Sequence, residues 1–292
     1  MIAKEVLKKV RQIQFKINRL SDDATAGHYA SVFKGSGIEF AEVREYYPGD
    51  DVRSIDWNVT ARNGRPFIKR YIEERELTLM LAVDLSASQY FGTSDRFKSE
   101  LAAEISALLA FLAMKNNDKV GLVIFTDHIE KYLSPQKGRL HVLRVIREIL
   151  GYQPQRSGTD IANALDFINK VTKHRSIVFM ISDFWDGNLE RSFKQTARRH
   201  DLVAIRISDP READLPALGL MEFTDRESGR KTLIDTSDPG LRRIVRENAL
   251  QQQRAVTQIF KRCQVDAIEI STAEPYLEPL QRFFLKRERR IR

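Results

Sequence analysis

The stretch Leu77-Thr-Leu-Met-Leu-Ala-Val-Asp-Leu-Ser-Ala-Ser88 decides the fold of this chain. Residues 77–84 are mostly apolar, which predicts a strand buried on both faces, as in a parallel sheet. Open α/β sheets bind their ligands at the carboxyl ends of such strands. The group Asp84-x-Ser86-x-Ser88 therefore stands where a binding site is expected. One carboxylate and two hydroxyls are the oxygen ligands that Mg²⁺ and Mn²⁺ prefer.

Two further oxygen donors extend this group. Thr159 lies in the turn Ser157-Gly-Thr-Asp160 before a helical pattern, and Asp183 ends a second apolar strand that begins at Ile177. As an alternative, the hydroxyl residues only form turns and helix caps, and for the triplet alone the two interpretations are equally good. The full set at the ends of two buried strands favours a metal site. We predict that Mg²⁺ or Mn²⁺, with Ca²⁺ as a further candidate, binds Asp84, Ser86, Ser88, Thr159 and Asp183.

Length and composition indicate a globular protein of the cytoplasm. A chain of 292 residues with 42% hydrophobic and 30% charged residues can bury one large core. The longest apolar run, residues 105–114, is interrupted by Ser106 and is too short to span a bilayer. The first residues lack the apolar core of a secretory signal. The single cysteine, Cys263, excludes an internal disulfide framework and a cysteine-based zinc site.

The positive charge is concentrated at the C-terminus. The net charge is +8, and residues 281–292 are rich in Arg and Lys. This tail has two interpretations: peripheral contact with acidic lipids or nucleic acid, or a solvated helix end whose cations suit the helix dipole. We favour the helix end. Zinc-finger spacing, stacking aromatics and long basic runs are missing from the sequence, so no dedicated nucleic-acid site is predicted.

From Leu77 onward strands and helices alternate. Strands are predicted at 77–84, 120–125, 129–133 (an edge strand), 177–182, 202–207 and 265–270, and helices near 95–115, 139–150, 160–170, 188–199, 238–263 and from 276. This alternation is typical of right-handed βαβ units. The predicted class is therefore α/β, with a mostly parallel central sheet and helices on both faces. Turn residues near 225–229 predict an inserted β-hairpin within 209–236.

The first 76 residues are predicted to form an N-terminal helix and a charged extended arm, and residues 77–292 the main domain. A heptad stripe at residues 2–20 predicts a helix that packs on its own domain or on a partner. The arm reads as two strands, at 37–46 and 67–72, with a turn and a helical turn between them. Its charged and aromatic residues are Arg44, Asp50, Asp51, Arg53, Asp56, Trp57, Arg62 and Arg65. We favour internal ion pairs that lock the arm onto the main domain, with Trp57 in the core; the alternative is an exposed interface.

Two motifs resemble known families. The five oxygen donors, on this strand order, resemble the metal-ion-dependent adhesion site of von Willebrand factor A domains. The segment from Arg44 to Arg62, Arg-Glu-Tyr-Tyr-Pro-Gly-Asp-Asp-Val-Arg-Ser-Ile-Asp-Trp-Asn-Val-Thr-Ala-Arg, resembles the hallmark of the domain-of-unknown-function 58 family, and this resemblance runs from about Ser21 to Leu285. Members of that family are commonly encoded beside MoxR-type AAA+ ATPases, so the resemblance implies a bacterial partner or adaptor of such an ATPase. The bulky stretch Gln89-Tyr-Phe-Gly92 departs from the small residues expected there and is expected to narrow the mouth of the site.

These features predict a metal-dependent protein-binding module that engages an acidic side chain of a partner through the cation, and not an enzyme. The alternative is a metal-dependent hydrolase or phosphatase, because a carboxylate beside Mg²⁺ is a common setting for phosphoryl transfer. The sequence disfavours it. Ser86 stands where a paired Asp would act as general acid, and the chain has no P-loop and no nucleophile elbow. Its five histidines are scattered, and none adjoins the proposed donors.

Overall fold

The chain folds into two compact units. The computed structural model describes residues 12, 23–33, 37–74, 77–90, 97–186, 189–224 and 230–291. Residues 33–77 form the smaller unit, and residues 1–32 and 78–292 together form the larger one. The structure thus divides the chain differently from the expected split at 76/77. Helix α2 (Asp23–Val32), which was not predicted, belongs to the larger unit because its buried Tyr29 packs edge-on against Phe284, with ring centroids 6.0 Å apart.

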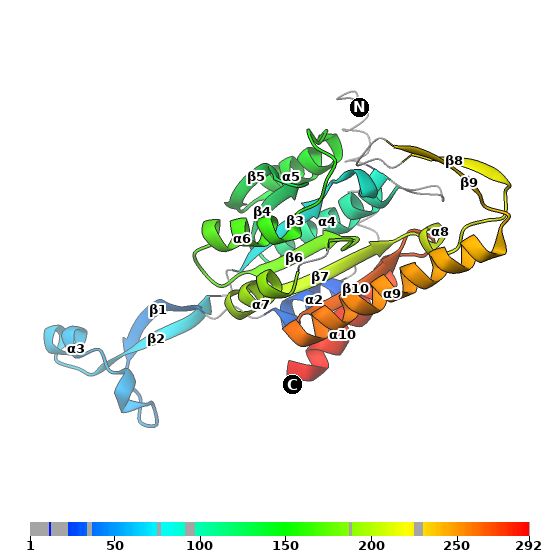
Figure 1. Cartoon of the computed structure of the whole chain (residues 1–292). Helices are drawn as coiled ribbons and strands as arrows, with labels where there is room; N and C mark the ends of the chain where they lie inside the picture. Colours follow the sequence, from blue (N-terminus) through cyan, green and yellow to red (C-terminus); the bar gives the residue numbers. More distant parts are fainter. Residues whose placement is uncertain are drawn as a thin grey trace. The chain divides into compact units, whose positions relative to one another are not determined.

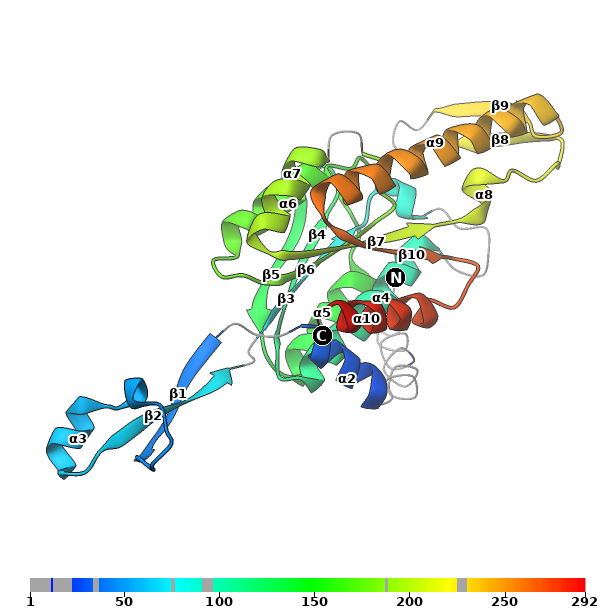
Figure 2. The same cartoon turned by 90° about the horizontal axis from the view of Figure 1, so that it is seen from below.

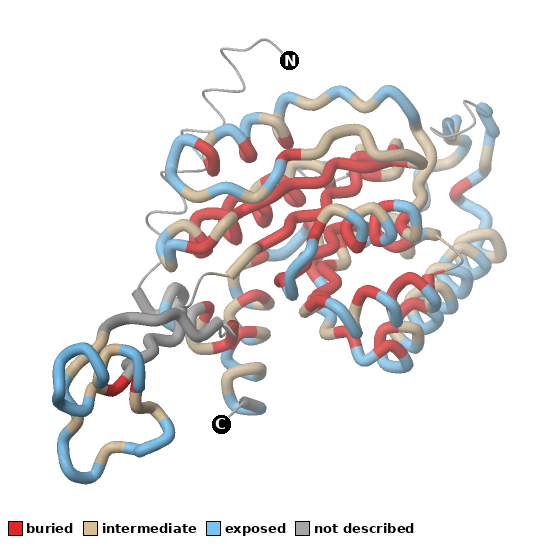
Figure 3. Tube along the Cα trace, turned by 90° about the vertical axis from the view of Figure 1, so that its left-hand side faces the viewer, coloured by how far each residue is buried: buried red, intermediate tan, exposed pale blue. Residues whose placement is uncertain are grey.

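A six-stranded sheet forms the centre of the larger unit (Figure 1). Its order is β10-β7-β6-β3-β4-β5, made of β3 (Thr78–Asp84), β4 (Lys119–Phe125), β5 (Ile129–Gln136), β6 (Ile177–Ser182), β7 (Asp201–Ser208) and β10 (Asp266–Ser271). Every neighbouring pair is parallel except β4 and β5. Figure 3 shows the strands of the sheet as the most buried part of the chain, which explains why β3 and β6 read as continuous apolar runs.

Helices cover both faces of this sheet. They are α4 (Lys98–Lys115), α5 (Arg139–Gly151), α6 (Ile161–Val171), α7 (Glu190–Arg199), α9 (Pro239–Cys263) and α10 (Leu277–Ile291), with the short η2 (Ala87–Tyr90) and α8 (Pro210–Ala213). Figure 2 shows α6, α7 and α9 on one face and α2, α4, α5 and α10 on the other. On the first face Phe184, Phe193 and Phe260 pack ring against ring, with centroids 5.1–6.1 Å apart. The predicted α/β class with a mostly parallel sheet is confirmed.

An antiparallel hairpin is inserted between α8 and α9, as the sequence predicts. It consists of β8 (Leu220–Thr224) and β9 (Lys231–Asp235), with Met221 opposite Ile234. Helix α9 begins directly after it, where Asp238 accepts a hydrogen bond from the backbone N–H of Gly240 and Pro239 occupies the first turn.

The smaller unit is a two-stranded arm. Strands β1 (Gly37–Glu45) and β2 (Phe67–Glu74) pair antiparallel, and the chain between them forms η1 (Val52–Ser54) and α3 (Trp57–Asn63). Asp51 and Asp56 cap these two helical segments through their carboxylates, which explains the Asp-rich sequence. Helix α3 was not predicted, because only a single helical turn was expected here.

The charged pairs that the structure records in this arm are internal to it. Arg44 binds both carboxylate oxygens of Asp50, at 2.9 and 2.7 Å, and Arg65 lies 3.3 Å from Glu45. The hydrogen bonds from Arg44 hold the pKa of Asp50 below its usual value. Trp57 is 67% exposed, so the expectation that it fills a core is wrong. It occupies the first position of α3, a helix in which no residue is buried.

Replacing Arg53 or Arg62 by alanine is expected to change the free energy of unfolding by less than about 0.5 kcal/mol, because both side chains are exposed and neither has an ion-pair partner among the described residues. Arg44→Ala is the matched contrast, since it removes a two-bonded pair, and it is expected to cost more than either. Thermal unfolding of the full chain measures all three variants. A large loss for Arg53→Ala or Arg62→Ala would restore the interpretation of a locking ion pair.

Two further expectations concern the N-terminal and C-terminal ends of the chain. The predicted helix at 2–20 lies, apart from Gln12, outside the described residues. The basic C-terminal end is more than a solvated helix end, because Arg287 lies 3.4 Å from Asp266 and also pairs with Asp201, while Arg290 lies 2.9 Å from Asp266. Within the described ranges no helix combines the length and apolarity needed to cross a bilayer. The cytoplasmic location stays a prediction.

Candidate metal centre

Asp84 is one of the two fully buried residues among the predicted donors, with Ser86. It ends β3, its side chain is fully buried, and the backbone N–H of Ser86 donates to its Oδ1 at 2.8 Å. Ser182, the last residue of the neighbouring strand β6, donates its hydroxyl to Asp84 Oδ2 at 2.6 Å. Because parallel strands end at the same edge of the sheet, the two residues meet although 98 positions separate them.

When no cation is bound, the surroundings of Asp84 destabilise the charged form of its carboxylate. Burial and the nearby charge of Asp183 raise the pKa of Asp84 from 3.8 to about 7, against the hydrogen bonds from Ser182 and Ser86 that lower it. Two carboxylates in one buried place disfavour each other's charge. A cation between or beside them would remove this penalty.

Asp183 follows β6 and is almost wholly buried. Its Oδ2 accepts a hydrogen bond from Lys98 Nζ at 2.7 Å. Its Oδ1 is buried and has no hydrogen-bond partner among the described residues. A buried carboxylate oxygen without a partner is costly, so Oδ1 of Asp183 is the atom best placed to accept a ligand that the protein itself does not supply.

Ser86 and Ser88 bring two hydroxyls to the same edge. Their Oγ atoms lie 3.1 Å apart, so one hydroxyl donates a hydrogen bond to the other. Ser86 is buried, whereas Ser88 is partly exposed. Of the two serines, Ser88 is therefore the one that solvent reaches.

Thr159 is carried to this edge by its loop and is also partly exposed. The backbone N–H of Ala87 donates to the carbonyl of Ser157 at 2.9 Å, and the backbone N–H of Ile161 donates to Asp186 at 3.0 Å. These bonds tie the loop to the segments after β3 and after β6. The structure thus brings the loop that carries Thr159 to the same edge of the sheet as the other four predicted donors.

Glu130 holds the segment that leads into this loop, and sequence reasoning missed it. Its carboxylate accepts hydrogen bonds from the Tyr152 hydroxyl, the Gln155 N–H and the Arg156 N–H, at 3.0, 3.0 and 3.2 Å. Burial opposes the charge of Glu130, but these bonds and one from Thr126 hold its pKa below the usual value. Glu130 thus fixes the course of the chain just before Thr159, a role that local sequence does not reveal.

Lys98 is the second residue that sequence reasoning missed. It opens α4, its side chain is fully buried, and its ammonium donates to Asp183 and to Glu212 of α8. Burial alone would lower the pKa of Lys98, but the two carboxylates outweigh it and hold the pKa above its usual value. One signal was present in the sequence. Lys98 stands at the head of the apolar stripe Leu101, Ile105, Leu108 and Leu112, where a charge needs a buried partner.

The donor set fits a hard divalent cation. Asp84 and Asp183 bring two carboxylates, and the hydroxyls are neutral oxygen donors. Within the described ranges there is no cluster of three or more His, Cys, Asp and Glu side chains that could hold a metal, so hydroxyls would have to complete any shell here. Lys98 neutralises one side of Asp183 and leaves the other oxygen free. Residues Asp84, Ser86, Ser88 and Asp183 are thus assembled at one edge, with the Thr159 loop beside them.

The chain is similar to known proteins in sequence and in fold. The family described as "Protein of unknown function DUF58" matches residues 42–255. An uncharacterized protein of Mycobacterium tuberculosis is 32% identical over 285 residues, which cover 96% of this chain and 89% of that protein. The crystal structure of an aerotolerance-related membrane protein from Bacteroides fragilis matches with a TM-score of 0.50 and 17% identity, covering 72% of this chain and 99% of that one. The VWA domain of SpRpn10 matches with a TM-score of 0.41 and 14% identity over 70% of this chain and 93% of that domain.

Proposed function

Since this chain belongs to the DUF58 family and its larger unit is an α/β domain with a mostly parallel sheet, we propose that it is a protein-interaction module that works through a divalent cation. The proposed cation is Mg²⁺ or Mn²⁺, and its ligands are Asp84, Ser86, Ser88, Thr159 and Asp183. The observation that carries the proposal is the buried, unpartnered Oδ1 of Asp183, which lies near the buried carboxylate of Asp84.

Each residue has a separate task in this proposal. Asp84 and Asp183 supply two negative charges, which at most neutralise the cation, and the three hydroxyl residues add ligands without charge. Lys98 orients Asp183 through its hydrogen bond to Oδ2. When bound, the cation would supply an open position that a carboxylate can fill. Ser88 and Thr159, the partly exposed members, form the side from which the acidic residue of a partner would approach.

The partner we propose is a MoxR-type AAA+ ATPase, to which this protein would be a bacterial adaptor. The proposal rests on the family resemblance carried by the segment from Arg44 to Arg62, and the matched relative from Mycobacterium tuberculosis is bacterial as well. The acidic side chain that enters the site would belong to this ATPase.

Binding of a purified MoxR-type ATPase from the same organism is expected to fall at least about tenfold when Mg²⁺ is replaced by a chelator, and equally when Asp84 is replaced by alanine, because either change removes the bridge between two carboxyl groups. Surface-attached full-length protein and titrated ATPase give the dissociation constants. Asp166→Ala is the matched control, since Asp166 is an exposed aspartate of α6. Equal affinity in Mg²⁺, in chelator and in Asp84→Ala would refute the proposal.

The absence of catalysis stays a prediction, and it has a simple test. A generic phosphate ester incubated with the protein and Mn²⁺ is expected to remain intact. Turnover that Asp84→Ala abolishes would instead show a metal-dependent phosphatase.

A further inference from the structure

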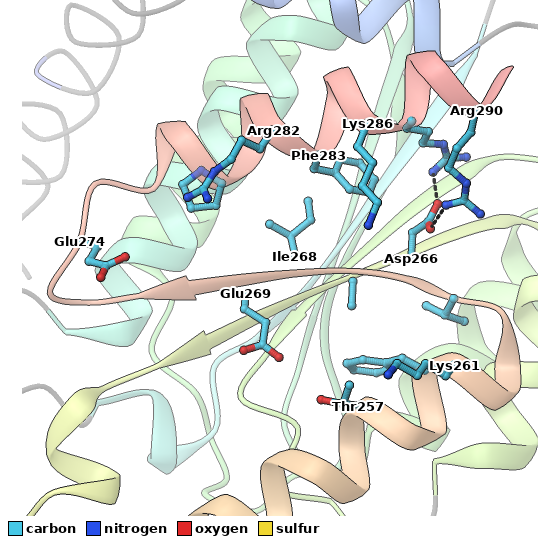
Figure 4. A pocket seen from close by; sticks show the side chains of 15 residues that line it. Thr257, Lys261, Asp266, Ile268, Glu269, Glu274, Arg282, Phe283, Lys286 and Arg290 are labelled. Atoms are coloured by element: carbon cyan, nitrogen blue, oxygen red, sulfur yellow. Dashed lines mark hydrogen bonds and ion pairs between the residues drawn. The ribbon is translucent and has the colours of Figure 1, made fainter. Parts of the chain in front are cut away.

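A groove of about 530 Å³ runs along the outer edge of β10, between α9 and α10 (Figure 4). Strand β10 is the last strand of the sheet, and α9 and α10 lie on opposite faces of it. The side chains show the same division. Asp266 bonds to Arg290 of α10, whereas Glu269 bonds to Gln253 of α9. The groove therefore opens onto the edge of the strand itself.

The backbone along this edge is available for pairing. Within the part of the chain that the structure describes, β10 pairs only with β7, in parallel from Asp266 to Ser271. The N–H and C=O groups on the other side of β10 have no partner strand. An edge of this kind is a template on which an extended segment can add as a further strand, and main-chain hydrogen bonds then give much of the affinity.

The walls suit a single extended segment. Phe260 from α9 and Phe283 from α10 line the groove on its two sides. Ala267, the second residue of β10, is small and exposed, so it leaves the backbone of the strand open to close approach. Phe260 is only 4% exposed, so the partly exposed Phe283 is the aromatic side chain that an apolar residue of an added strand would contact.

The charge of the groove selects the chemistry of the occupant. Lys261 of α9 and Lys286 of α10 both line the groove, are exposed, and have no ion-pair partner among the described residues. Asp266, at the start of β10, is already paired with Arg287 and Arg290. Two more acidic residues line the groove: Glu269 lies 3.6 Å from Arg206, and Glu274 lies at the far end of β10, away from both lysines (Figure 4). The two lysines thus leave positive charge on opposite walls near the start of β10, and Figure 4 shows Lys286 reaching from α10 toward β10.

From this edge and these charges we infer that the groove binds an extended, acidic segment of a partner protein, which adds to the sheet as a strand beside β10. Its backbone pairs with the free edge of β10, and its carboxylates contact Lys261 and Lys286. The site is separate from the metal centre at the ends of β3 and β6, and it needs no cation. It is therefore expected to bind its segment in chelator as well as in Mg²⁺.

A fluorescent peptide of alternating threonine and valine with aspartates at both ends tests this inference on the full chain in chelator. Fluorescence anisotropy is expected to show saturable binding. The same peptide with lysines in place of the aspartates is expected to bind at least about tenfold more weakly, because two attractive contacts become repulsive. The aspartate peptide is also made in two N-methylated forms, one for each set of alternate backbone amides. One of these two peptides is expected not to bind, because its methyl groups replace the N–H donors that pair with β10.

Charge reversal on the protein provides a second test of the inference. Lys261→Glu with Lys286→Glu is expected to weaken the aspartate peptide at least about tenfold. Lys170→Glu with Lys173→Glu changes the net charge equally at two exposed lysines outside the groove, and is expected to leave the affinity unchanged. The inference is overturned if the aspartate peptide fails to bind, if both double variants bind it alike, or if neither N-methylated peptide is weakened. Because the assay contains chelator, its outcome is independent of the proposed metal function.

Discussion

Replacing Lys98 by methionine is expected to lower the free energy of unfolding by about 3–5 kcal/mol. Methionine keeps most of the length and apolar volume of the side chain but removes the ammonium. Asp183, of which 2% of the side chain is exposed, and Glu212, of which 19% is exposed, would then lose the charge that compensates them. Breaking a buried ion pair from one side costs far more than the pair itself contributes, because an uncompensated charge remains.

Urea unfolding of the full chain in chelator measures this loss, and two further variants locate its cause. Lys194→Met removes an ion pair of equal length, 2.7 Å to Glu190, that is exposed on α7, and it is expected to cost much less. Adding Asp183→Asn to Lys98→Met is expected to recover part of the loss, since it removes the stranded charge. A Lys98→Met protein no less stable than Lys194→Met would show that Lys98 does not stabilise Asp183.

Replacing Asp84 by asparagine is expected to have the opposite sign and to stabilise the metal-free protein at pH 8. Burial and the neighbouring Asp183 raise the pKa of Asp84 from 3.8 to about 7. A rise of about three pKa units corresponds to about 4 kcal/mol, at about 1.4 kcal/mol per unit, which is the largest gain expected. Asparagine keeps an acceptor for the Ser86 N–H but carries no charge that must be buried.

The pH dependence gives this prediction its sign. Between pH 4 and pH 7 the folded protein holds a proton on Asp84 that the unfolded chain has released, so stability falls as the pH rises through this window. Below the unfolded pKa both states are protonated and the penalty is absent, and above about pH 7 it is complete. The advantage of Asp84→Asn over the wild type is therefore expected to grow from pH 4 to pH 7 and then to level off.

The same variant also separates charge burial from metal binding. Mg²⁺ is expected to raise the melting temperature of the wild type, because a ligand of the folded state alone stabilises it, and to leave that of Asp84→Asn unchanged. Melting temperatures across pH, each with Mg²⁺ and with chelator, give both results, with Asp166→Asn as the exposed control. An Asp84→Asn protein that is less stable than the wild type in chelator at pH 8 would contradict the claim that the buried charge of Asp84 destabilises the metal-free protein.

The sequence by itself determined the class of the larger unit and most of its elements, although not α2 or α8. Strands β3 and β6 are apolar except at their ends, and the stripe of α4 repeats every three to four residues, so local patterns alone identified a buried parallel sheet flanked by helices. Because parallel strands end at a common edge, the positions of Asp84 and Asp183 at two strand ends also predicted that they meet.

Only the tertiary structure decided which groups surround those two carboxylates and which edges stay open. The bonds from Lys98 to Asp183 and Glu212 join residues 85 and 114 positions apart, and no local period encodes such a choice. The exposure of Trp57 is a second property that the local sequence did not decide, because a tryptophan among charged residues is as compatible with a core as with a surface. Compensation of a buried charge and exposure of an edge strand depend on long-range packing, whereas strand and helix periodicity depend on neighbours along the chain.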